Sequence, residues 1–134
     1  MAGGNGYLGT VLAKYFKAMA GEIILLSRKP AAPDGNIKTV LWDGQTAGDW
    51  TNELNGADLL INLCGKNVNC RYTEENKAAI ISSRVVPTAL LGRVVAALSH
   101  PPKLWINLVS ATIYRHAEDH ARTRPPAKLA TGFL

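Results

Sequence analysis

Short apolar runs alternate with amphipathic stretches along most of this chain of 134 residues. The runs are rich in Ile, Leu and Val, as buried strands are, and they cover residues 22–27, 37–42, 57–63 and 103–110. Helical periodicity covers residues 7–19 and about 73–98, and a short helix is expected over 49–55. Because strands that alternate with helices pair in parallel through right-handed crossovers, the pattern predicts a doubly wound α/β sheet.

The longest helical stretch contains its own start signal and its own breaker. Thr73 is suited to cap the first turn, and Glu74 and Glu75 are favourable at the positive end of the helix dipole. Pro87 lies inside the stretch and is expected to kink the helix or to split it in two. After Tyr114 the periodicity is lost, so we divide the chain into a domain over 1–114 and an irregular basic tail over 115–134.

The chain opens on a glycine-rich segment, Gly3-Gly4-Asn5-Gly6-Tyr7-Leu8-Gly9, that leads directly into a helix. In a dinucleotide site the first glycine of such a segment permits a tight turn, the second lets the backbone approach the pyrophosphate, and the third allows close packing of the helix. The phosphates then meet free backbone N–H groups at the positive end of that helix. We therefore predict a phosphate-binding loop formed by Gly3, Gly6, Tyr7, Leu8 and Gly9.

A strand normally precedes this glycine segment and lies at the centre of the sheet. This sequence begins inside the loop, so we expect a sheet that lacks its first strand. The alternative is that Met1 is a genuine start and that another element fills the gap.

The residues after the first apolar run indicate which dinucleotide is bound. An acidic residue at this place would hold the ribose hydroxyls of NAD, but the chain has Ser27-Arg28-Lys29. A hydroxyl and two cations suit a 2′-phosphate, so NADP (NADPH) is favoured over NAD. A solvated basic turn before Pro30 is the alternative.

Composition and charge argue against several other classes of protein, among them nucleic-acid-binding, membrane and metal-binding proteins. The net charge is +5, but the basic residues are spread along the chain except for a cluster near its end, without interleaved aromatic residues, so nucleic-acid binding is not expected. No run of eighteen apolar residues and no signal peptide is visible, which predicts no membrane association and a cytoplasmic protein.

Cys64 and Cys70 are expected to be free thiols. His116 and His120 have no convincing third partner, so no metal site is predicted.

Six segments together resemble a known family: Gly3 to Gly9, Leu26-Ser27-Arg28, Trp42-Asp43, Asn62-Leu63-Cys64-Gly65, Ser83-Arg84, and Ser110-Ala111-Thr112-Ile113-Tyr114. In this order they are similar to the NAD(P)-dependent epimerase/dehydratase-like branch of the extended short-chain dehydrogenases. The resemblance implies a Rossmann-type sheet, a smaller C-terminal substrate domain, and hydride transfer to or from a nicotinamide. The substrate would be sugar-nucleotide-like or another small molecule.

The resemblance also implies roles for single residues. Arg28 matches the 2′-phosphate position beside Ser27, and Asn62 and Gly65 match the loop that lines the cofactor. Ser110 matches the hydroxyl that binds the substrate carbonyl or alcohol, although an ordinary serine at a strand end is the alternative. Lys66 and Tyr72 depart from the family, which favours Glu and Trp at these places. The Tyr-x-x-x-Lys pair of extended dehydrogenases falls beyond residue 134, so this chain alone is not expected to be catalytic.

The basic tail has two interpretations. Relatives continue with an acidic segment similar to Asp-Glu-Ala-Thr-Gly-Glu and then a Gly-Phe pair, whereas this chain has Arg122 to Lys128 before Gly132-Phe133. A reading frame shifted by two bases can convert one segment into the other, so the tail is either an out-of-frame segment or a genuine basic tail. The sequence therefore predicts the NADP-binding part of an oxidoreductase or epimerase. A non-enzymatic NADPH sensor and a non-functional fragment are the alternatives, and the oligomeric state is not predicted.

Overall fold

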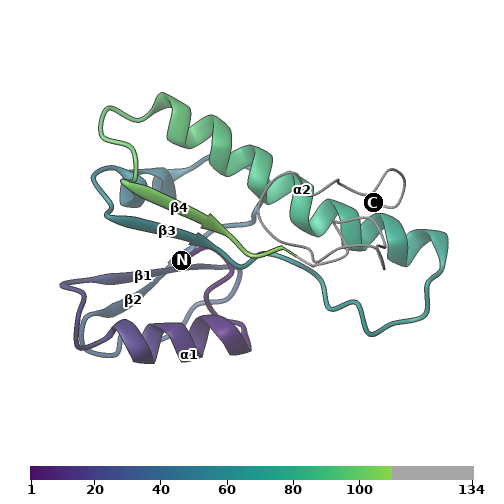
Figure 1. Cartoon of the computed structure of the whole chain (residues 1–134), viewed down its shortest axis with the longest axis horizontal. Coiled ribbons are helices and arrows are strands. Elements are labelled where there is room, and N and C mark those ends of the chain that lie inside the picture. Colours follow the sequence, from purple (N-terminus) through teal and green to yellow (C-terminus); the bar gives the residue numbers. More distant parts are fainter. Residues whose placement is uncertain (110–134) are drawn as a thin grey trace, which may run out of the picture.

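The computed structural model describes residues 1–109, and their elements follow the order that the sequence predicts (Figure 1). The strands are shorter than the apolar runs, and the short helix is a 3-10 helix, η1. The elements are α1 (Tyr7–Phe16), β1 (Ile23–Ser27), β2 (Ile37–Leu41), η1 (Asp49–Leu54), β3 (Leu59–Asn62), α2 (Glu74–Ala97) and β4 (Leu104–Asn107).

The strands form two parallel pairs that the start of the chain joins. β1 pairs with β2 and β3 pairs with β4, both in parallel. Ala2 lies between the pairs and forms parallel bridges to Leu26 and to Asn62. The strand order is therefore β2–β1–Ala2–β3–β4. The first strand of a dinucleotide-binding sheet would lie at this central position, and here a single bridge residue, Ala2, occupies it. The parallel pairs on either side confirm the predicted Rossmann-type topology.

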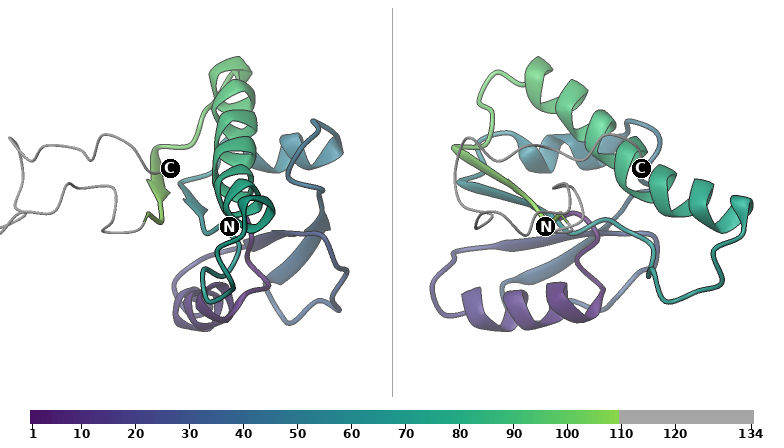
Figure 2. Two further views of the ribbon diagram at one scale, coloured as in Figure 1. Left: turned by 90° about the vertical axis from the view of Figure 1, so that its right-hand side faces the viewer. Right: turned by 45° about the vertical axis from the view of Figure 1, so that its right-hand side comes forward.

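The pleat of β1 sends alternate side chains to opposite faces of the sheet, as period-two geometry requires. Ile23 and Leu25 pack with Ala13 of α1 in one buried cluster. Leu26 belongs to a second cluster, with η1, β3 and α2, whose buried members include Trp42, Trp50, Leu54, Leu60, Leu90 and Leu91. Helices thus cover both faces, α1 on one side and α2 with η1 on the other, as a doubly wound sheet requires (Figures 1 and 2).

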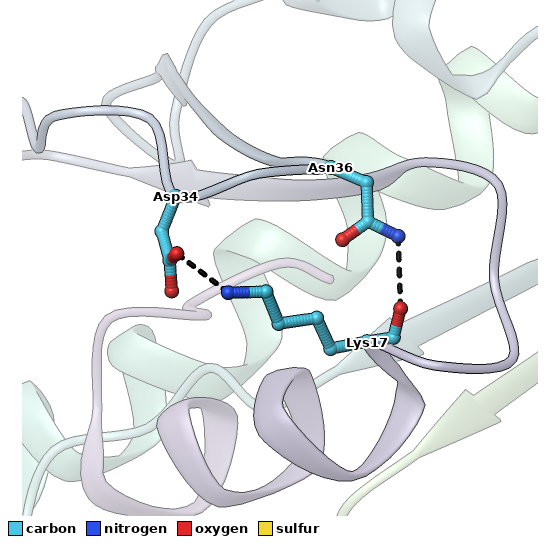
Figure 3. Close-up of polar contacts among 3 residues, drawn as sticks. All are labelled: Lys17, Asp34 and Asn36. Carbon is cyan, nitrogen blue, oxygen red and sulfur yellow. Dashed lines mark hydrogen bonds and ion pairs between the residues drawn. The ribbon is translucent and has the colours of Figure 1, made fainter.

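The end of α1 is fixed by the segment that leads into β2. The side-chain amide of Asn36 donates to the carbonyl oxygens of Lys17 (3.0 Å) and Ala20 (2.6 Å), which follow the helix. The Lys17 ammonium also pairs with Asp34 at 2.5 Å (Figure 3). Carbonyls at a helix C-terminus lack intrahelical partners, and the bond from Asn36 satisfies that of the C-cap Lys17, where α1 ends after Phe16, before the predicted end at residue 19.

α2 begins as predicted but is not divided. The Thr73 hydroxyl accepts a hydrogen bond from the Asn76 amide, and Glu74 and Glu75 occupy the first turn. Of the two outcomes expected at Pro87, a kink or a split, the split is wrong, because residues 74–97 form one helix; the kink stays a prediction. Pro87 is itself buried, and Leu90 and Leu91, one turn further on, belong to the larger core cluster. Tertiary packing on both sides of the proline holds the helix together despite the missing backbone donor.

α2 also bears on the question of membrane association. Among the described residues it is the one helix long and apolar enough to cross a bilayer, judged by length and composition alone. Arg84 and Arg93 interrupt its apolar sequence. A mostly buried core helix passes the same test; in α2 Ile80, Leu90 and Leu91 are buried, but only 22% of the apolar window is buried.

A substitution at Leu91 tests how α2 packs on the sheet. Its side chain is fully buried, at 0% relative exposure. We expect Leu91→Ala to lower the free energy of unfolding by about 3 kcal/mol, because it removes apolar contacts and leaves a cavity. Urea denaturation measures the change. Val86→Ala on the same helix is the matched control, since Val86 is 39% exposed. Equal losses in the two variants would contradict the packing described.

Candidate functional site

Two of the glycines in this segment, Gly3 and Gly9, are tightly packed against neighbouring backbone. Gly3 has a φ of +71°, a left-handed conformation that favours glycine, and it packs against the backbone of Leu63 and Cys64. Its amide donates to Leu26 O at 3.0 Å. A Cβ on Gly9 would overlap the carbonyl group of Gly4, so only glycine lets α1 approach the loop this closely. Gly3 therefore makes the tight turn expected of the first glycine, whereas Gly9 packs against Gly4 of the loop rather than against a strand; that these glycines bind a phosphate stays a prediction.

The first turn of α1 has backbone donors without intrahelical acceptors; Tyr7 and Leu8 are exposed there, whereas Gly9 is buried. Gly6 is the N-cap, and no side chain caps the helix. The first intrahelical hydrogen bond runs from Thr10 N to Gly6 O at 3.0 Å, so the amides of Tyr7, Leu8 and Gly9 precede it and lack intrahelical acceptors. No acidic residue lies in this turn, and Tyr7 is 88% exposed. Such a helix start attracts an anion through its N–H groups and its dipole.

The basic turn lies at the carboxyl end of β1 and is tied to the glycine segment. Ser27 is buried, and its hydroxyl accepts a hydrogen bond from the Lys29 amide at 3.2 Å. The Asn5 side chain donates to Lys29 O at 3.3 Å. The side chain of Arg28 is exposed. Ser27 therefore shapes the turn, whereas the exposed side chains of Arg28 and Lys29 are free to reach a ligand.

An open cavity adjoins Arg28, and no role was predicted for the residues that line its other walls. It has a volume of about 960 Å³ and extends from Arg28 over the end of β2 to η1. Asp43 lines it and accepts hydrogen bonds from the Gln45 amide (2.7 Å) and from the amide and hydroxyl of Thr46 (2.8 and 2.7 Å). The hydroxyl of Thr46, followed by these amides, lowers the pKa of Asp43 to about 2. Asp43 is therefore ionised at neutral pH and fixes the turn that forms the cavity wall.

Asn62 is surrounded by protein partners. Its buried side chain donates to Thr88 Oγ1 and to Asn107 Oδ1, both at 2.9 Å, and accepts from the Cys64 amide at 3.1 Å. It therefore connects the end of β3 to α2 and β4 and shapes the loop that follows β3. That Asn62 and Gly65 line the cofactor stays a prediction; the structure places Gly65 exposed in this same loop.

Cys64 lies behind the glycine segment, with its Sγ beside Gly3. Burial raises the pKa of its thiol to about 11, against the opposing effect of nearby Arg28. The thiol is therefore protonated at neutral pH and adds no negative charge to the site. Both cysteines are free thiols, as predicted.

Three further predictions concern residues outside the described part of the chain. Ser110, the tail over 115–134 and the His116 and His120 pair all follow residue 109. Within residues 1–109, no cluster of three or more His, Cys, Asp or Glu side chains could hold a metal ion.

Comparison with known proteins places this geometry in a family context. The profile of the NAD dependent epimerase/dehydratase family matches residues 1–131. The epimerase family protein SDR39U1 of Bos taurus is 33% identical over 118 residues, which are 86% of this chain and 37% of that protein. The epimerase family protein YfhF of Bacillus subtilis is 30% identical over 135 residues, covering the whole of this chain and 44% of the relative. The chain thus spans about two fifths of the length of these relatives.

Solved structures show the same fold. The crystal structure of human SDR39U1 with NADPH superposes with a TM-score of 0.70 at 28% identity, over 89% of this chain and 38% of that one. Uronate dehydrogenase of Agrobacterium tumefaciens, in complex with NAD, gives a TM-score of 0.66 at 23% identity, over 86% of this chain and 42% of its own. The second likeness concerns the fold alone.

Alkylation tests the surroundings of Cys64. A thiol with a pKa of about 11 is about 0.1% thiolate at pH 8, and only the thiolate reacts with iodoacetamide. We expect Cys64 in a Cys70→Ser variant to react slowly at pH 8 and progressively faster as the pH rises to 11. Mass spectrometry follows the reaction, and urea-unfolded protein is the control. A rate at pH 8 equal to that of the unfolded chain would contradict the burial of Cys64.

Proposed function

Because the chain belongs to the NAD dependent epimerase/dehydratase family, we propose that it is the NADP-binding part of an oxidoreductase or epimerase of the extended short-chain dehydrogenase class. The observation that carries the proposal is the open first turn of α1 behind the tightly packed glycine segment. Backbone donors without intrahelical acceptors at a helix start suit the pyrophosphate of a dinucleotide. The complete reaction would be hydride transfer on a sugar-nucleotide-like or other small substrate.

The proposed preference for NADP rests on Arg28. This exposed guanidinium follows β1, beside the glycine segment and at the edge of the open cavity, and no acidic residue occupies the place where NAD-binding sites hold the ribose hydroxyls. A guanidinium forms paired, charge-assisted hydrogen bonds with a phosphate. The NADPH complex of human SDR39U1, at 28% identity, supports the same choice.

The positions of the remaining residues in the fold or in the sequence suggest their proposed roles. The amides of Tyr7, Leu8 and Gly9 would hold the pyrophosphate, and the loop after β3 would line the cofactor at Gly65. A nicotinamide dinucleotide supplies the hydride chemistry when bound. Ser110 would hydrogen-bond the substrate oxygen on which charge changes during transfer.

Gly6→Val tests the phosphate loop. The nearest protein atom to a Cβ at this position is Gly3 O at 3.7 Å, so the fold tolerates a side chain there. The valine would occupy the space in front of the first turn, where the pyrophosphate is proposed to lie. We expect loss of measurable NADPH binding in fluorescence titrations, with an unchanged circular dichroism spectrum and melting temperature. NADPH affinity equal to that of the wild type would overturn the proposed loop.

Arg28→Glu tests the cofactor preference. Replacing the guanidinium with a carboxylate removes charge-assisted hydrogen bonds and adds repulsion, so NADPH affinity should fall by roughly 10- to 100-fold or more. NADH affinity should change much less, because NADH has no 2′-phosphate. Lys14→Glu is the matched control, since it makes the same charge change on the exposed last turn of α1. Equal losses for NADPH and NADH would remove the basis for NADP.

A further inference from the structure

The loop of residues 63–66, which follows β3, is held between the glycine segment and α2. On one side, the Leu63 amide donates to Ala2 O at 2.9 Å, and Cys64 packs against Gly3. On the other side, the loop reaches the second and third turns of α2. Its position relative to the phosphate loop is therefore set from two directions.

Two neighbouring residues of α2 hold both polar groups of one loop residue. The Ser83 hydroxyl accepts a hydrogen bond from the Lys66 amide at 2.8 Å and donates to Ile80 O at 2.8 Å. Arg84 Nη2 donates to Lys66 O at 3.2 Å, and its Nη1 donates to Ile80 O at 3.1 Å. Ser83 thus satisfies the amide of Lys66, Arg84 satisfies its carbonyl, and both are anchored to the same helical carbonyl.

Gly65 fits this arrangement because the guanidinium lies over its Cα. A Cβ at Gly65 would come within 3.0 Å of Arg84 Cζ and 3.2 Å of Nη2. The φ of Gly65 does not require glycine, so alanine would displace the guanidinium rather than strain the backbone. Gly65 therefore permits the contact between Arg84 and Lys66.

We propose that Ser83 and Arg84 are positioning residues that clamp the backbone of Lys66 to α2 and so hold the 63–66 loop against the phosphate loop in the geometry that binds the cofactor. The effect of this clamp on cofactor binding rests on the proposed function, but the hydrogen bonds of the clamp itself can be measured without any cofactor. Ser83 acts through the amide of Lys66, and Arg84 acts through its carbonyl.

The test combines amide exchange with cofactor binding in the full chain. We expect Ser83→Ala to speed hydrogen exchange of the Lys66 amide at least several-fold in the absence of cofactor, because the amide loses its acceptor. NADPH affinity should fall by roughly 3- to 10-fold, the factor that corresponds to one hydrogen bond. Ser83→Thr keeps the hydroxyl and should restore both values. Gly65→Ala and Arg84→Met should weaken NADPH binding to a similar degree.

Two control variants separate this role from general damage to the helix. Ser82→Ala and Arg93→Met alter exposed residues of α2, and Ser82 hydrogen-bonds only within that helix, to Ala79 O. Both should leave Lys66 exchange and NADPH affinity unchanged. Unaltered Lys66 exchange in Ser83→Ala would overturn the clamp. Faster exchange with unaltered NADPH affinity would overturn its role in binding, whereas a wild-type chain that binds no NADPH would refute the proposed function and leave the exchange test standing.

Discussion

The structure depends on the backbone of residues 1–3, which joins its two strand pairs. The amide of Ala2 donates to Ile61 O and its carbonyl accepts from Leu63, both at 2.9 Å. The carbonyl of Met1 accepts from Leu26 at 2.9 Å, and the Gly3 amide donates back to Leu26 O at 3.0 Å. These bonds alternate between β3 and β1, as they do along a strand inside a parallel sheet. They bring the carboxyl ends of β1 and β3 to the same edge, where open α/β sheets bind their ligands.

The charge of the candidate site follows from this arrangement. The start of α1 and the guanidinium of Arg28 both lie at this edge, and both attract anions. Cys64 lies behind them, and its raised pKa keeps it uncharged at neutral pH. Asp43 is ionised, but three hydrogen bonds from Gln45 and Thr46 already satisfy it. The local field therefore favours a phosphate at the glycine segment independently of the net charge of +5.

The order of elements could be predicted from the sequence because periodicity reports which faces are buried, and the glycine spacing reports a backbone requirement. The sequence allowed either a kink or a split at Pro87, and the split does not occur; the local rule for proline does not include the burial of Leu90 and Leu91 in the core. The hydrogen bonds by which Asn62 connects β3 to α2 and β4 could not be predicted, because its partners Thr88 and Asn107 are 26 and 45 residues away in the chain. The cavity beside Arg28 likewise depends on how η1 and β2 meet, so it was not predicted, although Trp42-Asp43 of its lining belongs to the segments that resemble the family.

Two neighbouring loops at the sheet edge use their backbone amides in opposite ways. Between residues 63 and 66, the amides of Leu63, Cys64 and Lys66 all have acceptors within the protein. At the start of α1, by contrast, the amides of residues 7–9 precede the first helical hydrogen bond. A loop with three of its four amides satisfied internally gains little from binding an anion, whereas an unsatisfied helix start gains a hydrogen bond with each amide that it uses. The phosphates of a ligand should therefore bind at the glycine segment, and the 63–66 loop should contribute shape, which is why holding Lys66 in place matters for affinity.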